Sequence, residues 1–190
     1  MVKLEKTVLL VVDIQNSFVE EGSPNEIEII KDNLEKLKNF IDFCRDGGIE
    51  IIYTRHAFDR EKNIIEAKLF PPKMNEALRK GSHGWEIHDK IGPKEGDIII
   101  DKNKYDAFHG TNLNDVLRSK GTENVIITGT ITQVCCESTA RSAMSYDYNV
   151  IFCSDLNFSF DEELHERTLK VIKRSFGEVL NSEEIMKKFV

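Results

Sequence analysis

The chain has 190 residues, a length that suits a single domain spanning residues 1–190. Hydrophobic residues make up 40% of the sequence and charged residues 31%, a balance typical of soluble globular proteins and not of disordered ones. The net charge is −7 and no basic stripe is interleaved with aromatic residues, which argues against a nucleic-acid partner.

The sequence gives no sign of a membrane or secreted location. Its longest purely apolar run, residues 8–12, is far too short to span a bilayer, so we expect no membrane partner. The N-terminal stretch contains acidic residues and no small-residue cleavage site, unlike a signal peptide. The four cysteines (Cys44, Cys135, Cys136 and Cys153) form neither a C-x-x-C pair nor a zinc pattern. A cytoplasmic protein with free thiols is therefore expected.

Short apolar runs, rich in β-branched residues, predict the strands. Because these runs are apolar on both faces, they are typical of buried parallel strands. In chain order they lie at residues 8–12, 49–53, 98–100, 125–128 and 150–153, with a weaker candidate at residues 178–180.

The segments between these runs have the periodicity of amphipathic helices. The predicted helices are marked by residues 30–44, 112–120, 133–146 and 161–174. For the first helix, residues 23–26 (SPNE) indicate a capping box with Pro24 at the first helical position, and Gly47-Gly48 indicates the end. Thr132 and Asp161 are expected to cap the last two helices.

Strand–helix alternation implies right-handed crossovers and a sheet covered on both faces. We therefore predict an α/β fold, a three-layer α/β/α sandwich. Its sheet would be mainly parallel and six-stranded, in the Rossmann-like order 3-2-1-4-5-6.

Residues 57–95 break this alternation. The segment holds Pro71-Pro72 and Trp85, the one tryptophan of the sequence. It is longer than most connections between elements, so it is either a functional insertion or a loop with short helices.

Familiar cofactor and nucleophile motifs are absent from the sequence. The first strand is followed by DIQNSF, which lacks the glycines of a dinucleotide-binding turn. There is also no phosphate-binding G-x-x-x-x-G-K-[ST] loop and no G-x-S-x-G elbow. We therefore expect no cofactor.

Polar residues follow three of the predicted strands, at the edge where parallel sheets bind ligands. Asp13 ends the first strand, Lys102 follows the third, and Cys135 lies in the first turn of the helix after the fourth. Each has an ordinary interpretation as a turn cap, a solvated lysine or a core cysteine. Together they form a set of acid, cation and nucleophile, with the helix N-terminus favouring a thiolate.

These residues belong to motifs that resemble those of the isochorismatase-like cysteine hydrolases. Residues 9–18 resemble the first-strand motif of this family, and residues 51–56 resemble its second-strand motif. The lysine motif, K-x-x-Y-[ST]-x-F-x-G-T, is similar to residues 96–113, and the cysteine motif, G-x-x-T-x-x-C-x-x-x-T-A, to residues 129–143. Residues 176–185 are similar to the closing strand and helix of the family.

The resemblance implies roles for individual residues. It implies a catalytic triad in which Cys135 is the nucleophile, Asp13 the acid and base, and Lys102 the third member. It also implies a cis peptide bond before Ile131, with the backbone N–H groups of Ile131 and Cys135 forming an oxyanion hole.

Three departures from the family pattern limit which reaction is expected. A cysteine at the nucleophile position points away from isochorismate and toward C–N hydrolysis through an acyl-enzyme. The family's nicotinamidases bind a metal through a D-x-H motif. Residues 56–58 (HAF) stand at that position and do not preserve the motif, so no metal is expected. Asp106 replaces a small hydroxyl residue and either alters the pocket or faces solvent.

The expected protein is a metal-independent amidohydrolase acting on a small-molecule amide, carbamoyl or ureido substrate. His56, Trp85, Tyr105 and Phe108 are pocket candidates, although the core interpretation is favoured for Trp85 and Phe108. The family resemblance implies a homo-oligomer, either a dimer or a tetramer. Two alternatives stay open: an isochorismatase-type vinyl-ether hydrolase, and a non-catalytic thiol-bearing binding protein.

Overall fold

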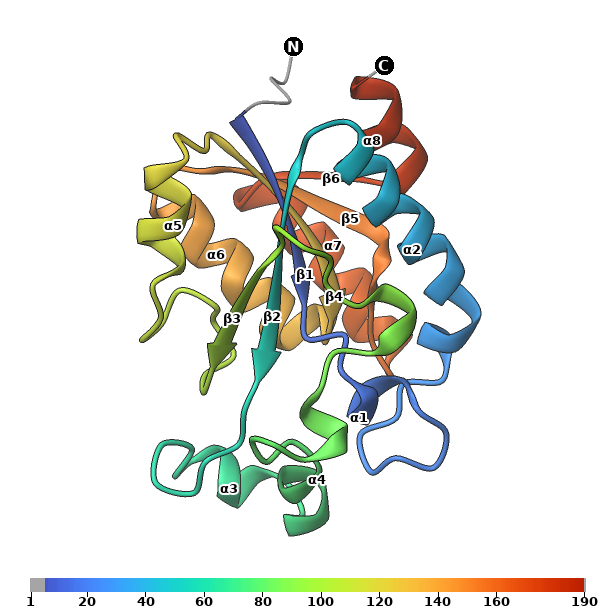
Figure 1. Cartoon of the computed structure of the whole chain (residues 1–190), viewed down its shortest axis with the longest axis vertical. Coiled ribbons are helices and arrows are strands. Elements are labelled where there is room, and N and C mark those ends of the chain that lie inside the picture. Colours follow the sequence, from blue (N-terminus) through green and yellow to red (C-terminus); the bar gives the residue numbers. More distant parts are fainter. Residues whose placement is uncertain (1–5, 190) are drawn as a thin grey trace.

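The computed structural model of the protein describes residues 6–189, and its centre is a six-stranded parallel sheet (Figure 1). The strand order is β3-β2-β1-β4-β5-β6, which confirms the predicted α/β topology. The strands are β1 (Thr7–Val12), β2 (Glu50–His56), β3 (Ile98–Lys102), β4 (Asn124–Thr130), β5 (Asn149–Phe158) and β6 (Glu178–Leu180).

Helices cover both faces of this sheet. They are α1 (Asn16–Val19), α2 (Ile29–Asp46), α3 (Glu66–Leu69), α4 (Pro72–Ala77), α5 (Leu113–Ser119), α6 (Glu137–Ser145), α7 (Glu162–Ser175) and α8 (Ser182–Lys188). Helices α2 and α8 lie on one face, and α5, α6 and α7 lie on the other (Figure 1). None of the helices within residues 6–189 has the length and apolar character that a membrane crossing requires.

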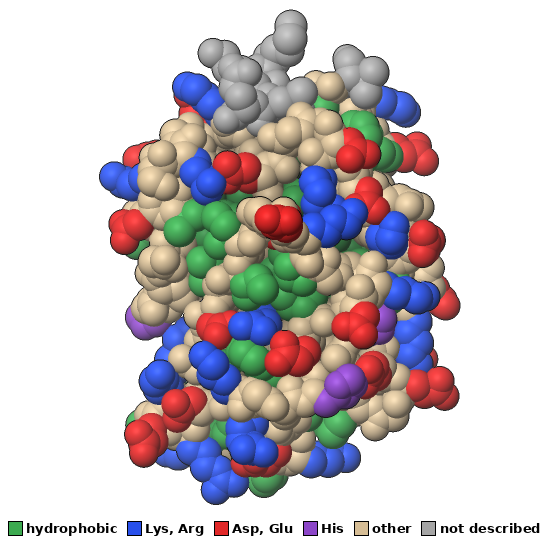
Figure 2. Space-filling model, in the orientation of Figure 1, with side chains coloured by type: hydrophobic (Ala, Val, Ile, Leu, Met, Phe, Trp, Pro, Cys, Tyr) green, Lys and Arg blue, Asp and Glu red, His purple; other side chains and the backbone are tan. Residues whose placement is uncertain are grey.

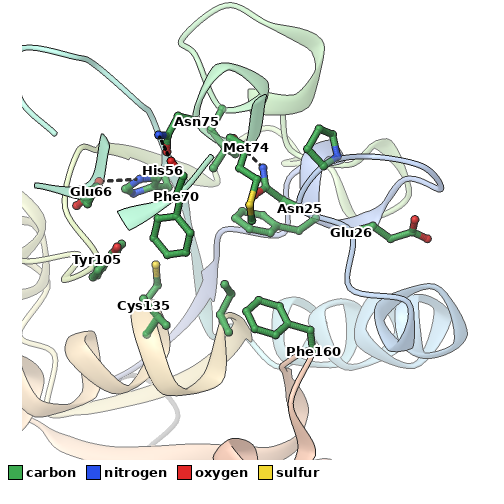
Figure 3. Close-up of a pocket in the computed structure, with 15 residues that line it drawn as sticks. Asn25, Glu26, His56, Glu66, Phe70, Met74, Asn75, Tyr105, Cys135 and Phe160 are labelled. Carbon is green, nitrogen blue, oxygen red and sulfur yellow. Dashed lines mark hydrogen bonds and ion pairs between the residues drawn. The ribbon is translucent and has the colours of Figure 1, made fainter. Parts of the chain in front are cut away.

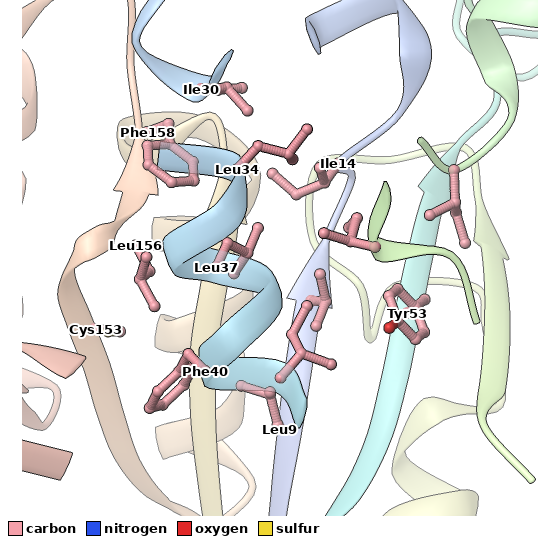
Figure 4. Packing of buried hydrophobic residues seen from close by; sticks show 14 of the residues in the cluster. Leu9, Ile14, Ile30, Leu34, Leu37, Phe40, Tyr53, Cys153, Leu156 and Phe158 are labelled. Atoms are coloured by element: carbon pink, nitrogen blue, oxygen red, sulfur yellow. The ribbon is translucent and has the colours of Figure 1, made fainter. Parts of the chain in front are cut away.

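The central strand β1 contributes to two hydrophobic clusters because its side chains alternate between the two faces. Leu9 and Val11 pack in the cluster beneath α2, and Val8, Leu10 and Val12 pack in the cluster on the opposite face. Figure 4 shows the apolar side of α2 against the first cluster. All six side chains of β1 are buried, which explains the uninterrupted apolar run from Val8 to Val12.

Helix α2 ends where the sequence predicts, but it begins later. It ends at Asp46, before Gly47. The predicted capping box is wrong, because both of its partners bond elsewhere: Ser23 Oγ donates to the Ser17 carbonyl at 2.6 Å, and Glu26 accepts from the Gly22 N–H at 2.7 Å. The chain around residues 23–26 therefore forms turns, and α2 begins at Ile29.

The strands extend further toward the C-terminal edge of the sheet than the sequence indicates. Strand β3 runs to Lys102, and β5 continues to Phe158 past an irregularity in its pairing with β4. Asn157 bridges this irregularity, since its side chain donates to the carbonyls of Ile127 (2.8 Å) and Cys153 (2.7 Å). A polar side chain thus satisfies carbonyls of the adjacent strands at the irregularity.

Residues 57–95 form a loop with short helices, as one of the two sequence interpretations states. The segment contains α3, α4 and two 3₁₀ turns, and α3 and α4 lie beyond the C-terminal ends of β2 and β3 (Figure 1). Buried Asn63 holds the segment in place: its Oδ1 accepts from the Asp59 N–H at 2.9 Å, and its Nδ2 contacts Glu66 and the Asn103 carbonyl. The segment is therefore a fixed wall against the strand ends.

Candidate active site

Asp13 follows β1 directly and is completely buried. Its backbone is in the left-handed region (φ 52°), a conformation that costs a non-glycine residue roughly 1–3 kcal/mol and is common at functional sites. The neighbouring strand fixes the residue: Thr54 Oγ1 donates to Asp13 Oδ1 at 2.6 Å, and the Asp13 N–H donates to the Thr54 carbonyl at 3.2 Å. The other carboxylate oxygen, Oδ2, faces Lys102.

Lys102 is the last residue of β3 and its ammonium is also buried. The Nζ atom lies 2.6 Å from Asp13 Oδ2 and donates to the Lys104 carbonyl at 3.1 Å. Burial alone would lower the pKa of Lys102, but the charge of Asp13 and the neighbouring Cys135 sulfur outweigh it and raise that pKa above its usual value. The side chain is therefore a permanent cation beside the carboxylate.

Cys135 lies in a turn of π-helix, Thr132–Cys136, between β4 and α6. Ligand atoms of Cys135, Asp13 and His56 all lie within 4.8 Å of one another. Burial raises the pKa of the Cys135 thiol well above its usual value; Lys102 opposes this shift and Asp13 adds to it. Burial of this sulfur beside a carboxylate therefore favours the thiol form, which a base must deprotonate before the sulfur can attack.

The adjacent Cys136 is oriented differently. It is fully buried in the hydrophobic cluster on the α5–α6–α7 face and is not among the pocket residues. Burial raises the pKa of its thiol well above the usual value. Only Cys135 of this pair therefore presents its sulfur to the pocket.

Ile131 precedes this turn, and the Thr130–Ile131 peptide bond is cis. The carbonyl of Ile131 accepts from the N–H groups of Val134 (2.9 Å) and Cys136 (3.3 Å), which holds the turn together. The predicted cap at Thr132 is wrong, because its hydroxyl is hydrogen-bonded to His165 Nδ1 at 3.0 Å. Ile131 and Cys135 both line the same pocket.

A cavity of about 130 Å³ opens onto the thiol of Cys135 (Figure 3). Residues from α1 and the α1–α2 connection, the end of β2, the segment 57–95 and the turns after β3, β4 and β5 surround it. They are Phe18, Pro24, Asn25, Glu26, His56, Glu66, Phe70, Met74, Asn75, Leu78, Tyr105, Ile131, Val134, Cys135 and Phe160.

Two of the pocket candidates, His56 and Tyr105, line this cavity. His56 Nε2 lies 3.5 Å from Glu66 Oε2, and its buried Nδ1 has no hydrogen-bond partner within residues 6–189. Burial opposes ionisation of Glu66, yet the hydrogen bond from His56 brings the pKa of Glu66 below its usual value. Burial, with help from Glu66 and Cys135, raises the pKa of Tyr105 to about 12, so its hydroxyl stays neutral.

The other two candidates lie outside the cavity lining. Trp85 is buried beneath the guanidinium of Arg55, whose Cζ is 3.7 Å from the ring centroid. Phe108 packs against Tyr146, at 5.2 Å between ring centroids, in the cluster on the α5–α6–α7 face. Large aromatic side chains are equally suited to a core, which the sequence could not distinguish from a pocket wall.

Asp106, which departs from the lysine motif of the family, makes hydrogen bonds that connect two parts of the fold. Its carboxylate accepts from the Phe108 N–H at 2.9 Å and from Ser142 Oγ at 2.7 Å. It therefore connects the turn after β3 to helix α6, and it is not among the residues of the cavity.

A buried acid, a buried ammonium and a cysteine sulfur thus meet at the ends of β1, β3 and β4. The family model for the isochorismatase domain matches residues 7–184, which include all of these elements. The chain belongs to the isochorismatase family.

Individual relatives extend over nearly the whole chain. Nicotinamidase 3 of Arabidopsis thaliana is 31% identical over 183 residues, covering 93% of this chain and 85% of that protein. Ureidoacrylate amidohydrolase RutB of Agrobacterium fabrum is 27% identical over 196 residues, covering 92% and 86%. The crystal structure of a cysteine hydrolase from Pseudomonas syringae pv. phaseolicola superposes with a TM-score of 0.94 at 27% identity, covering 99% of this chain and 94% of that one.

Asp13, His56 and Cys135 also form the one group within residues 6–189 whose spacing could hold a metal ion. The chemistry of this donor set does not fit a resident metal. The Lys102 ammonium, 2.6 Å from Asp13 Oδ2, already takes the place of a cation beside the carboxylate. In this chain, the cation beside the Asp13 carboxylate is the Lys102 ammonium.

Sequence reasoning missed most of the cavity wall. Glu66, Phe70, Met74 and Asn75 come from the segment 57–95, and Asn25 comes from turns that the sequence suggested were a helix start. The one available signal was the unusual length of that segment, because long connections often carry function.

Proposed function

We propose that the protein hydrolyses a C–N bond of a small non-peptide amide, carbamoyl or ureido compound through a thioester on Cys135. The observation that carries this proposal is the buried Asp13–Lys102 ion pair next to a thiol that opens onto a cavity. A thiol with a raised pKa is a weak nucleophile until a neighbouring base removes its proton, and Asp13 is that base. Catalysis of this kind contributes roughly 10²–10⁴ to a rate.

Acylation begins when the Cys135 sulfur attacks the substrate carbonyl carbon and its proton passes to Asp13. The carbonyl oxygen becomes an oxyanion, which accepts hydrogen bonds from the backbone N–H groups of Ile131 and Cys135. When the C–N bond breaks, Asp13 returns the proton to the leaving nitrogen, so ammonia or an amine departs. Lys102 stabilises the carboxylate form of Asp13 before and after this transfer.

Deacylation uses the same groups in the same order. A water molecule gives a proton to Asp13 as its oxygen attacks the thioester carbonyl. The C–S bond then breaks, and the Cys135 sulfur recovers a proton from Asp13. The products are the acid and the amine, and the enzyme returns to its starting protonation state.

The relatives support C–N hydrolysis over the vinyl-ether alternative. Those reported above include a nicotinamidase and a ureidoacrylate amidohydrolase, whose names describe C–N chemistry. A buried ion pair set against a thiol also exceeds what a passive thiol-bearing binding protein needs, since burying charges is costly without function.

An ammonia-release screen over small amides, ureas and carbamoyl compounds tests the proposal. We expect turnover by the wild-type protein, none by Cys135→Ala, and most of the wild-type rate by Cys136→Ala. Mass spectrometry after an acid quench should find the acyl group on the peptide that contains Cys135. Release of pyruvate from isochorismate without ammonia would instead support the vinyl-ether alternative. Absence of any turnover, with a redox-dependent partner, would support the binding protein.

We also propose that the enzyme works as a dimer or tetramer in the cytoplasm. Exposed apolar side chains support self-association, because large apolar patches usually mark contact surfaces. They include Ile99 on the edge strand β3 and Ile64, Ile65 and Leu69 around α3. Figure 2 shows an apolar area near the middle of one face, in the region of β3. Light scattering of the purified protein gives the assembly state directly, and a monomer would contradict the proposal.

A further inference from the structure

The cavity next to Cys135 is small and its walls are mainly apolar. Its volume of about 130 Å³ lies far below the roughly 300–1,000 Å³ of pockets that hold drug-sized ligands. The apolar wall includes Phe18, Phe70, Met74, Leu78, Val134 and Phe160 (Figure 3). Such a wall binds a short aliphatic chain or a single small ring by removing it from water.

The charged side chains that line the cavity cannot form an ion pair with a substrate anion. Apart from His56, they are Glu26 and Glu66, and no lysine or arginine within residues 6–189 lines the cavity. Glu26 is paired with Lys31, whose Nζ lies 2.8 Å from its Oε1. The His56–Glu66 pair has a net charge of zero or −1, depending on the protonation of the histidine, and is never positive.

The nearby ammonium groups are already engaged elsewhere. Lys102 Nζ is neutralised by Asp13, and Lys104 Nζ donates to the Lys62 carbonyl at 2.6 Å. A carboxylate entering this cavity would lose its hydration and find no cation in return, and Glu66 would repel it.

The remaining polar groups match a neutral primary amide. Nδ2 of Asn25 donates to the Met74 carbonyl at 2.9 Å, so this amide group holds the walls together. Among the fully buried side-chain atoms of the lining, the one with no hydrogen-bond partner within residues 6–189 is Nδ1 of His56, a side chain only 6% exposed. Because the Glu66 carboxylate can only accept, the neutral ring carries its proton on Nε2, which leaves Nδ1 to accept from a substrate N–H.

We infer that the substrate is a small uncharged primary amide or urea with an apolar substituent, and that the pocket rejects analogues carrying a carboxylate. The inference rests on the proposed function, and it distinguishes this chain from enzymes that act on acidic ureido compounds. His56 orients the amide N–H₂, and Glu66 both fixes the histidine tautomer and repels anions.

Isosteric substrate pairs test this inference. Each pair differs in one carboxylate: 4-methylpentanamide against succinamate, and isobutylurea against N-carbamoylglycine. We expect kcat/KM for the neutral member to exceed that for the acid by at least about tenfold, which corresponds to about 1.4 kcal/mol. Equal or better turnover of the acids would overturn the inference while leaving the proposed function intact.

Binding to the Cys135→Ala variant separates specificity from chemistry. Calorimetry should show the neutral member of each pair binding at least about tenfold more tightly than the acid. Tighter binding of the acids, or binding of neither member, would overturn the inference. Binding of the neutral member that is never turned over by the wild-type protein would overturn the proposed function alone.

A charge added at the rim should change this preference. Phe160 lines the cavity and is 61% exposed, so Phe160→Arg can add a cation there without burying it. We expect this variant to shift the kcat/KM ratio of each pair toward the acid by about tenfold or more, and Phe160→Gln, which also loses the ring but adds no charge, to shift it much less. An unchanged ratio in folded Phe160→Arg, or an equal shift in Phe160→Gln, would overturn the inference.

Discussion

Lys102 Nζ lies 2.6 Å from Asp13 Oδ2, and neither side chain has any exposed surface. Two charges buried this completely depend on each other, because each would otherwise be left unpaired in a medium that solvates it poorly. The pair therefore links the stability of the fold to the chemistry of the site.

Replacing Lys102 with methionine should affect activity and stability together. The variant leaves the Asp13 carboxylate buried without its cation, and breaking a buried ion pair costs roughly 3–5 kcal/mol. We expect turnover to fall by orders of magnitude and the midpoint of thermal unfolding to drop, both measured against Lys104→Met. Undiminished turnover in Lys102→Met, together with an inactive Lys104→Met, would place the role on Lys104.

The two adjacent cysteines should react very differently with iodoacetamide. Burial raises both thiol pKa values, but Cys135 lines the cavity and Cys136 does not. Because the thiolate is the reactive form, labelling of Cys135 should be slow at neutral pH and should accelerate continuously between about pH 7 and 10 without a plateau. Peptide mass spectrometry at each pH gives the rates.

The matched variants provide the control for this experiment. Cys136→Ala should show the same labelling profile and lose activity with labelling, at a packing cost of roughly 1–3 kcal/mol. A plateau below pH 8 would reveal a resting thiolate and contradict the raised pKa of the Cys135 thiol. Preferential labelling of Cys136 would remove Cys135 from the mechanism.

Chelation should leave the activity unchanged. Lys102 takes the position that a cation would need beside Asp13, so we expect the reaction to need no metal ion. The measurement is ammonia release before and after dialysis against EDTA, with metal content checked in parallel. Loss of turnover that zinc, iron or manganese restores would show that Asp13, His56 and Cys135 hold a metal after all.

Gly129 should tolerate no side chain. Its φ is +128°, and a Cβ atom there would lie 2.0 Å from the Val12 carbonyl oxygen, which belongs to the strand that positions Asp13. We expect Gly129→Ala to lose at least about 4 kcal/mol of unfolding free energy or to fail to fold. Gly121→Ala is the matched control, since nothing lies within 4 Å of its Cβ position, and it should cost about 1 kcal/mol. Chemical denaturation of both variants makes the comparison.

The sequence predicts the sheet well because the strands are strongly determined locally. The run from Val8 to Val12 is apolar on both faces, and only a central parallel strand buries both. The strand order and the convergence of Asp13, Lys102 and Cys135 follow from the alternation of elements and the family motifs. Asp161 also caps α7 as predicted, accepting from the Leu164 N–H at 2.9 Å.

The pocket and the protonation of the thiol could not be predicted in this way. Glu66, Met74 and Asn75 reach the cavity because buried Asn63 and short helices fold residues 57–95 back on the strand ends, and no local periodicity encodes that path. Similarly, the thiolate that a helix N-terminus favours is opposed at Cys135 by burial of the sulfur. Desolvation of Cys135 depends on walls that are distant in sequence.

The proposed catalytic groups and most of the cavity wall come from different parts of the chain. Strand ends hold Asp13 and Lys102, whereas turns and short helices in residues 24–26 and 66–78 supply much of the wall. The reaction machinery and its substrate filter can therefore evolve separately. Exchanging a connecting segment between family members would transfer a substrate preference without changing the catalytic groups. This separation makes the scaffold suitable for engineering amidases with chosen specificity.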